Sequence, residues 1–277
     1  MDMRSIYILT LLLLSMIGCS EADLKLYSDE SRVYLGGYTR ASSTTFYYDT
    51  DDVTRDTLYV YVETMGGPRD YDRAVTFKQV TVYDIEYTVE NGMKVDSVVT
   101  ENPYNAIAGK HFVAFDSEEA KRLMVIPANK VSALIPVIFL RDPSLKENEH
   151  YLTVQLCEND EFKIGGVKED VEYAFTCADK LIKPNFWGTN PFAGGFLAFG
   201  DYSTRKHEFM IEVSGERIDD EWWNTKVNSV AGAQNYYKAK FKTALDKYNN
   251  APTNIASGTA PMREIEEDLS SKLITFK

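Results

Sequence analysis

Two apolar runs near the middle of the chain constrain its fold more than any other feature. Ala133–Leu140 is almost wholly apolar. Tyr151–Leu156 alternates strictly, with an aliphatic residue at every second position. Turn-forming residues follow both runs, at Asp142-Pro143 and at Glu158-Asn159-Asp160. Short runs of this kind between turn formers are typical of β-strands rather than helices. The stretch from Ala108 to Glu161 therefore predicts a β-sheet protein.

Several shorter strands are predicted on either side of this stretch. They are Arg32–Leu35, Thr45–Tyr48, Thr57–Glu63, one or two within Arg73–Val89, Val95–Val99 and Val171–Cys177. Asn91-Gly92 separates two of these runs, and both positions of the favoured two-residue hairpin turn need φ > 0, which Asn and Gly adopt most easily. Short strands with regular turns predict an antiparallel β-sandwich of the immunoglobulin-like type.

The cysteines at the ends of two predicted strands fall on opposite faces. The apolar side chains of Tyr151–Leu156 point inward and leave Cys157 outward, whereas Cys177 shares the inward face of Val171–Cys177. Because successive side chains in a strand alternate between faces, the two thiols point apart. We therefore expect no disulfide between them, although an exported protein would permit one.

The composition changes after residue 182, where Pro, Gly and Asn gather in Pro184–Pro191. Such a segment is typical of a linker or an ordered loop. Ala233–Asn249 is the clearest predicted helix, because Tyr237, Phe241 and Leu245 form one apolar stripe along it. This part of the chain therefore predicts a small helical unit packed on the sandwich.

Three further elements are predicted in this unit. Ser203–Val213 fits a helix capped by Ser203 and ended by Gly215, or a strand with alternating apolar residues, and we favour the helix. Pro261 is placed to open a helix over Met262–Leu269. Leu273–Phe276 fits a closing strand.

The N-terminus has the pattern of an export signal. Arg4 precedes an apolar run over Ile6–Ile17 that is too short to span a bilayer comfortably. The run ends in Gly18-Cys19 in a way that resembles a bacterial lipobox, and this resemblance implies that Cys19 is lipidated and becomes the first residue of the mature protein. Ser20-Glu21-Ala22-Asp23 resembles the acidic tag that sends Bacteroidota lipoproteins to the outer face of the outer membrane. An ordinary secretory signal is the alternative.

The predicted fold class is mainly β, with an Ig-like antiparallel sandwich followed by a smaller helical part. The predicted organisation is a lipoprotein signal peptide over 1–18, an acidic tether over 19–25, the sandwich over 26–182 and an α-rich domain over 183–277. The net charge of −12 argues against nucleic acid as a partner, because a polyphosphate is bound through an excess of Lys and Arg.

No catalytic motif is found in the sequence. Zinc-protease, phosphate-loop, nucleophile-elbow and dinucleotide patterns are missing, and His111, His150 and His207 are far apart in the chain. Acidic clusters such as Asp49/Asp51/Asp52, Asp70/Asp72 and Asp219-Asp220-Glu221 are candidates for paired hydrolytic carboxylates or for calcium ligands, but none has EF-hand spacing. We predict no enzyme and no cofactor, with calcium as an open alternative and an unrecognised hydrolase as the least favoured function.

The candidate ligand-binding residues are Trp187, Trp222 and Trp223, which lie beside amide and carboxylate side chains. Exposed aromatic rings next to such groups are suited to sugar rings, whose apolar faces stack while their hydroxyls are hydrogen-bonded. The alternative is that these tryptophans anchor the helical unit through their large buried area.

Two resemblances to known families add context. The first is to the Calx-beta module, which has an Ig-like fold. The motifs that resemble it, in the same order along the chain, are Gly109–Val113, Val125–Asn129 and Leu134–Val137. The family usually carries Asp where His111 stands and Gly where Asn129 stands, so no calcium ligand is transferred.

A second resemblance covers most of the mature chain. Its motifs resemble the Bacteroidota lipoproteins of domain-of-unknown-function family 4843; they are Ile126-Pro127, Phe139–Lys146, Glu158–Gly165, Asp179–Pro184 with Trp187, and Phe199–Ser203 with Lys206. Such proteins tend to be encoded with outer-membrane nutrient importers of the starch-utilisation type. The resemblance implies a TonB-dependent transporter and a SusD-like lipoprotein as partners, with glycan as a ligand class.

The predicted function is that of a lipid-anchored protein on the cell surface, at the outer membrane. We expect it to be an accessory binding or assembly component of a nutrient-uptake system, with glycan as the expected nutrient. The alternative is a purely structural protein–protein interaction module that touches no ligand.

Overall fold

The structure is a computed structural model that describes residues 30–165, 171–188, 194–266 and 268–276. The predictions for the signal peptide, the tether and Cys19 fall outside these residues. No helix in the described ranges combines the length and the apolar character that a membrane crossing requires.

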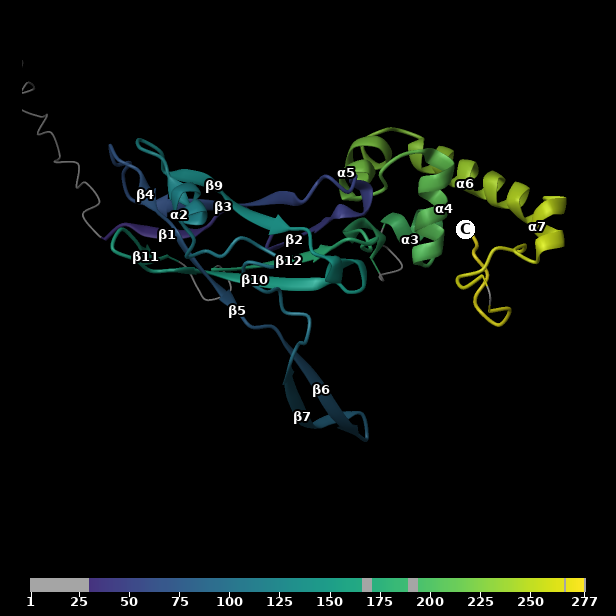
Figure 1. Cartoon of the computed structure of the whole chain (residues 1–277), viewed down its shortest axis with the longest axis horizontal. Coiled ribbons are helices and arrows are strands. Elements are labelled where there is room, and N and C mark those ends of the chain that lie inside the picture. Colours follow the sequence, from purple (N-terminus) through teal and green to yellow (C-terminus); the bar gives the residue numbers. More distant parts are fainter. Residues whose placement is uncertain (1–29, 166–170, 189–193, 267, 277) are drawn as a thin grey trace, which may run out of the picture.

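Two four-stranded sheets pack face to face and form the predicted sandwich (Figure 1). The first sheet has the order β11 (Lys163–Ile164), β1 (Arg32–Leu35), β3 (Arg55–Met65), β9 (Ser132–Leu140). The second has the order β2 (Ala41–Thr45), β12 (Glu172–Ala178), β10 (His150–Cys157), β5 (Thr76–Val80). Most neighbours are antiparallel, but β1 pairs with β11 and β12 pairs with β2 in parallel. The predicted mainly β sandwich is therefore confirmed.

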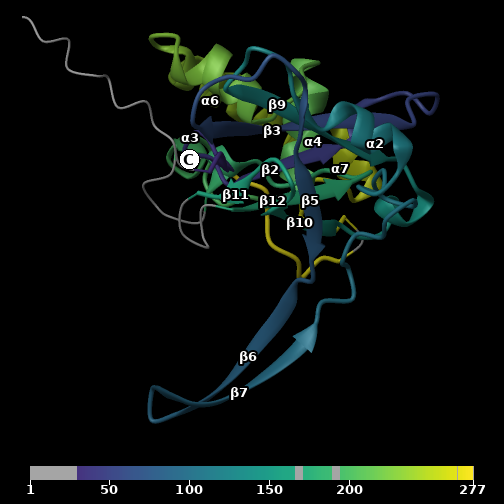
Figure 2. The same cartoon turned by 90° about the vertical axis from the view of Figure 1, so that its left-hand side faces the viewer.

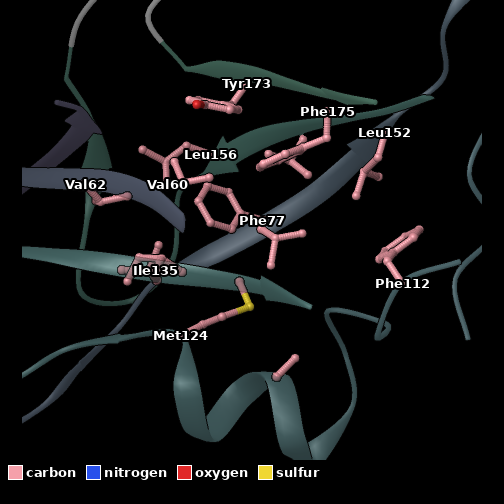
Figure 3. Close-up of a cluster of buried hydrophobic side chains, with 14 of the residues drawn as sticks. Val60, Val62, Phe77, Phe112, Met124, Ile135, Leu152, Leu156, Tyr173 and Phe175 are labelled. Carbon is pink, nitrogen blue, oxygen red and sulfur yellow. The ribbon is translucent and has the colours of Figure 1, made fainter. Parts of the chain in front are cut away.

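Alternating side chains build the sandwich core, which Figure 3 shows in part. In β3, Val60 and Val62 are fully buried while Tyr59 and Tyr61 face solvent, as the period-two pattern predicts. Cys157 and Cys177 are free thiols, and only Cys177 is buried. The predicted placement of the two thiols on opposite strand faces is consistent with this difference.

Short elements close the sandwich at its edges. They are β4 (Arg73–Ala74), which pairs with β8 (Val125–Ile126), helix α2 (Glu118–Leu123), and the 3-10 helices η1 (Phe46–Tyr48) and η2 (Pro143–Lys146). The predicted strand Thr45–Tyr48 is wrong beyond its first residue. The Thr45 hydroxyl accepts a hydrogen bond from the Tyr47 N–H, which turns the chain into η1 and buries Phe46.

A second core lies among the helices of the C-terminal part. These are η4 (Asn185–Trp187), α3 (Gly194–Phe199), α4 (Thr204–Ser214), α5 (Asp220–Trp222), the π-helix η5 (Trp223–Asn228), α6 (Ala233–Asn249) and α7 (Pro252–Ser257). The predicted helices at α4 and α6 are confirmed, including the Ser203 cap and the left-handed Gly215 at the end of α4. The predicted boundary at residues 182 and 183 falls between the sandwich core and this helical core.

The last predicted elements differ from the structure. The described part of Met262–Leu269 is not helical, and Leu273–Phe276 forms only an isolated bridge, between Leu273 and Arg263. Ile274 donates its N–H to the Met262 carbonyl, and Ile274 and Phe276 are buried in the helical core. Burial of these side chains by the helices therefore holds the segment as a loop.

A β-hairpin projects away from the sandwich, and we call it the arm (Figures 1 and 2). It consists of β6 (Tyr83–Glu90) and β7 (Met93–Glu101). Asn91 and Gly92 both have positive φ, so the predicted hairpin turn is confirmed.

Candidate functional site

The three tryptophans that were candidates for ligand binding are buried in the helical core. Trp187 is 0%, Trp222 3% and Trp223 8% exposed. The ring of Phe186 stacks on Trp187 and Trp223, with centroids 5.8 and 4.8 Å apart. No indole face is left for a ligand, which argues against sugar stacking and fits the alternative of an anchoring role.

One carboxylate ties this aromatic core together. Glu216 accepts hydrogen bonds from the indole of Trp222 at 2.6 Å, the hydroxyl of Tyr237 at 3.1 Å and the ammonium group of Lys226 at 3.0 Å. Partial burial alone would raise the pKa of Glu216, but the hydrogen bonds from Trp222, Lys226 and Tyr237 lower it below the ordinary value. This carboxylate is therefore structural rather than a free acid or base.

The candidate acidic cluster at Asp219 and Asp220 also has a structural role. Asp219 caps α5 by accepting the Trp222 N–H, and it pairs with Arg217 at 2.6 Å. Asp220 accepts the backbone N–H groups of Asn185 and Phe186. The two carboxylates thus hold the loop before α5 against η4, and both are engaged by these partners.

A histidine pair forms that the sequence did not predict. The rings of His111 and His150 lie 4.0 Å apart between centroids, and both side chains are buried. His111 Nε2 lies 3.0 Å from the Ser144 hydroxyl, which donates to Asp142 at 2.6 Å. Serine, histidine and aspartate are thus adjacent, as in a hydrolytic triad.

The hydrogen bonds of this cluster point the wrong way for catalysis. His111 Nδ1 accepts the Ile107 N–H at 3.0 Å, which assigns the proton of the neutral ring to Nε2. Nε2 therefore donates to Ser144 and cannot take its proton, as a general base would have to do. Burial, together with His150, lowers the pKa of His111 to about 4, which keeps the ring neutral at physiological pH.

Within the described ranges, no three His, Cys, Asp or Glu side chains are grouped as a metal ion would require. We assign no calcium ligands.

Strand β6 of the arm has one apolar and one acidic face. All residues of β6 and β7 are exposed. Tyr83, Ile85, Tyr87 and Val89 share one face, because side chains alternate along a strand, and each is between 47% and 58% exposed. The opposite face of β6 carries only polar or acidic side chains: Asp84, Glu86, Thr88 and Glu90.

The Asn105 side chain joins the two strands of the arm at its root. The Asn105 amide accepts the Val82 N–H at 2.8 Å and donates to the carbonyls of Val82 and Asn102 at 3.0 and 2.8 Å. Asn105 itself pairs with Tyr151 of β10. The arm is therefore fixed to the second sheet at its base, although the described residues of the sandwich core include none from the arm.

An apolar groove runs beside β5, next to the arm. It has a volume of about 430 Å³. Its floor contains Phe112, Phe115 and Met124, and its rim carries the charged side chains Lys78, Lys121 and Asp116.

Comparisons with known proteins agree with part of the predicted family assignment. The model of the family described as a domain of unknown function (DUF4843) matches residues 84–216, from the arm to the loop after α4. No curated protein matches the chain significantly.

Two solved structures are similar to part of the chain. The apo form of the Calx CBD1 domain is 12% identical, has a TM-score of 0.32 and is covered fully by 55% of this chain. A protein of unknown function from Bacteroides ovatus is 16% identical, also with a TM-score of 0.32. That likeness covers 52% of this chain and 43% of the other protein.

Proposed function

We propose that this chain is a non-enzymatic accessory protein of an outer-membrane nutrient-uptake system, and that it assembles with a protein partner through the β6–β7 arm. We further propose that a lipid on Cys19 holds it at the cell surface. The observation that carries the assembly function is the exposed apolar face of β6, which belongs to neither core.

The arm needs a partner on physical grounds. An isolated two-stranded hairpin is at best marginally stable in water, because it cannot cover its own apolar side chains. Four large apolar residues in a row on β6 expose a patch on the order of several hundred Å², the size at which such patches mark interaction sites. A protein surface that covers this face stabilises both the hairpin and the complex.

The burial of all three tryptophans favours assembly over sugar binding as the accessory role. The arm equally supports the alternative function, that of a purely structural interaction module. An accessory uptake protein and a structural module differ in the identity of the partner. The resemblance to family 4843 directs the search to a TonB-dependent transporter or a SusD-like lipoprotein.

Photo-cross-linking of the full chain in its own membrane tests the proposal. A photoreactive phenylalanine analogue replaces Tyr87 on the arm or, as a matched control, Tyr59 on the outer face of β3; these side chains are 47% and 54% exposed. We expect a discrete protein adduct from position 87 and none from position 59. An additional Ile85→Asp substitution should remove the adduct, because a desolvated carboxylate opposes docking.

The proposal fails if position 87 gives no adduct or the same adducts as position 59. Lipidation is tested separately by palmitate labelling, which should be lost in Cys19→Ala. Labelling that persists in this variant would remove the anchor from the proposal and leave the docking function untouched.

A further inference from the structure

The strands β5 and β6 expose one continuous edge of unpaired backbone groups. In β10, the Leu156 N–H donates to the Val171 carbonyl, on the β12 side of the strand. The backbone N–H and C=O groups of Gln155, and of every second residue from it, therefore point toward β5. In an antiparallel strand, the backbone groups of successive residues point to opposite edges. Lys78 is therefore hydrogen-bonded through its backbone to Gln155, whereas the N–H and C=O groups of Phe77 and Gln79 point away from β10 to the open edge.

The arm continues the same pattern. The Asn102 N–H bonds to the Val82 carbonyl, so the even-numbered residues of β6 face β7. The backbone groups of Tyr83, Ile85 and Tyr87 then point outward, on the same parity as those of Phe77 and Gln79. Among the described residues, no backbone hydrogen bond is made on this side between Phe77 and Tyr87. Long open edges of this kind are templates for another strand.

We propose that the partner of this edge is the same edge of a second copy of the chain, in a two-fold symmetric dimer. The inference rests on the proposed role of the arm as the docking element. In the dimer, β6 of each copy lies antiparallel to β5 of the other, and the arms are exchanged.

A two-fold axis at Val82 gives this pairing a specific register. Phe77 then lies opposite Tyr87 of the second copy, and Gln79 lies opposite Ile85, with their outward backbone groups facing each other. The same register places Lys78 opposite Glu86, so that opposite charges meet directly across the strands. Each contact occurs twice, as a two-fold interface requires.

The groove beside β5 accepts the apolar face of the arm in this arrangement. Opposed residues in a sheet point to the same face, so Ile85 and Tyr87 point inward as Phe77 does. Phe77 is buried beside the groove whose floor contains Phe112, Phe115 and Met124. The arm of the second copy therefore covers the groove while the groove covers its exposed apolar residues.

Charge and pattern favour a second copy over an unrelated strand. A strand that fits this edge has apolar side chains at alternate positions, which lie opposite Phe77, and acidic side chains between them, which lie opposite Lys78. β6 has this alternation, with Ile85 and Tyr87 flanking Glu86, and its open edge has the matching parity.

Disulfide trapping of the full chain in membranes tests the register. Lys78→Cys and Glu86→Cys are combined in one chain, in a Cys157→Ser background. The control combines Lys78→Cys with Val98→Cys, because Val98 pairs with Glu86 but lies on β7, one strand farther from the edge. All three positions are exposed, so the substitutions leave both cores intact.

We expect oxidation to link two copies through positions 78 and 86, with about tenfold less linkage for the control, because thiols whose Cα atoms are more than about 7 Å apart cannot be bridged without backbone movement. Equal linkage in both pairs, or none in either, overturns the dimer. If neither pair links but a photoreactive group at position 87 labels a different protein, the dimer is refuted and the proposed assembly function stands. If position 87 labels nothing, both are refuted.

Discussion

Glu216 offers the sharpest test of how the helical unit is held together. Replacement by Ala removes the acceptor for the Trp222 indole, the Tyr237 hydroxyl and the Lys226 ammonium group. The Trp222 indole is buried and would be left without a partner. An unsatisfied buried donor costs about 1–3 kcal/mol, and hydrogen bonds to charged groups contribute about 1.5–3 kcal/mol.

We therefore expect Glu216→Ala to lower the free energy of unfolding of this unit by about 3 kcal/mol, discounting the half-exposed Lys226 as a surface partner. Glu216→Gln should cost about 1 kcal/mol, because an amide oxygen still accepts the indole proton but the charge is lost. Glu212→Ala is the matched control. Glu212 is an exposed glutamate paired with Arg205, and its loss should stay within about 0.5 kcal/mol.

The pH dependence gives an independent check. The pKa of Glu216 is lowered in the folded protein, so its stabilisation is fully present above the ordinary value of 4.5 and is lost as the pH falls through the lower folded value. The difference in unfolding free energy between wild type and Glu216→Gln should be constant from neutral pH to about pH 5 and shrink below it.

Urea unfolding followed by tryptophan fluorescence is the assay. All three tryptophans of the chain lie in the helical unit, so the signal reports on that unit and not on the sandwich. A loss in Glu216→Ala no larger than in the Glu212→Ala control would refute the role of this carboxylate. A wild-type-to-Gln difference that stays constant down to pH 3 would refute its lowered pKa.

Three further outcomes are expected. Gly195→Ala should destabilise the helical unit by about 1–3 kcal/mol in the same assay, although Ala usually favours helices, because its Cβ would lie 2.8 Å from the Phe186 ring and 2.9 Å from the Trp187 backbone; a neutral effect would contradict this packing. The sandwich, followed by far-UV circular dichroism, should lose stability as the pH falls from 6.5 toward 4, because the unfolded His111 takes up a proton that the folded one, with its pKa of about 4, does not; His111→Gln should flatten that slope. Asn105→Ala should leave the melting temperature nearly unchanged but increase amide hydrogen exchange across the arm, since it removes the side chain that fixes the arm's root; unchanged exchange would show that the root is held by other contacts.

The strands that the sequence predicted best are those in which the hydrophobic pattern and the flanking turn formers both indicate a strand. β9 and β10 are apolar or alternating and end at turn formers, and the Asn91-Gly92 turn identifies the arm as a hairpin. That the arm stands free of the sandwich could not be predicted, because its alternation is the same as that of a half-buried strand. Whether such a strand is covered depends on whether another sheet lies beside it.

The candidate site illustrates the same dependence on tertiary structure. Helical geometry predicts that adjacent tryptophans point about 100° apart, and hence that at most one of Trp222 and Trp223 could face a ligand. It does not predict that Phe186 and Tyr237 would cover both. The pairing of His111 with His150 has no sequence signal. It arises because the segment that contains His111 runs from the edge of β10, where His150 lies, to the edge of β9.

The two residues that join β5 to β6, Thr81 and Val82, have a consequence for how this region can change in evolution. Side-chain direction and backbone direction both alternate with a period of two, so an insertion or deletion of one residue here would exchange the acidic and apolar faces of β6 relative to β5. It would also move the open edge to the other side of the strand. In related chains that keep the arm in this role, length changes between β5 and β6 should therefore occur in even numbers, whatever residues fill them.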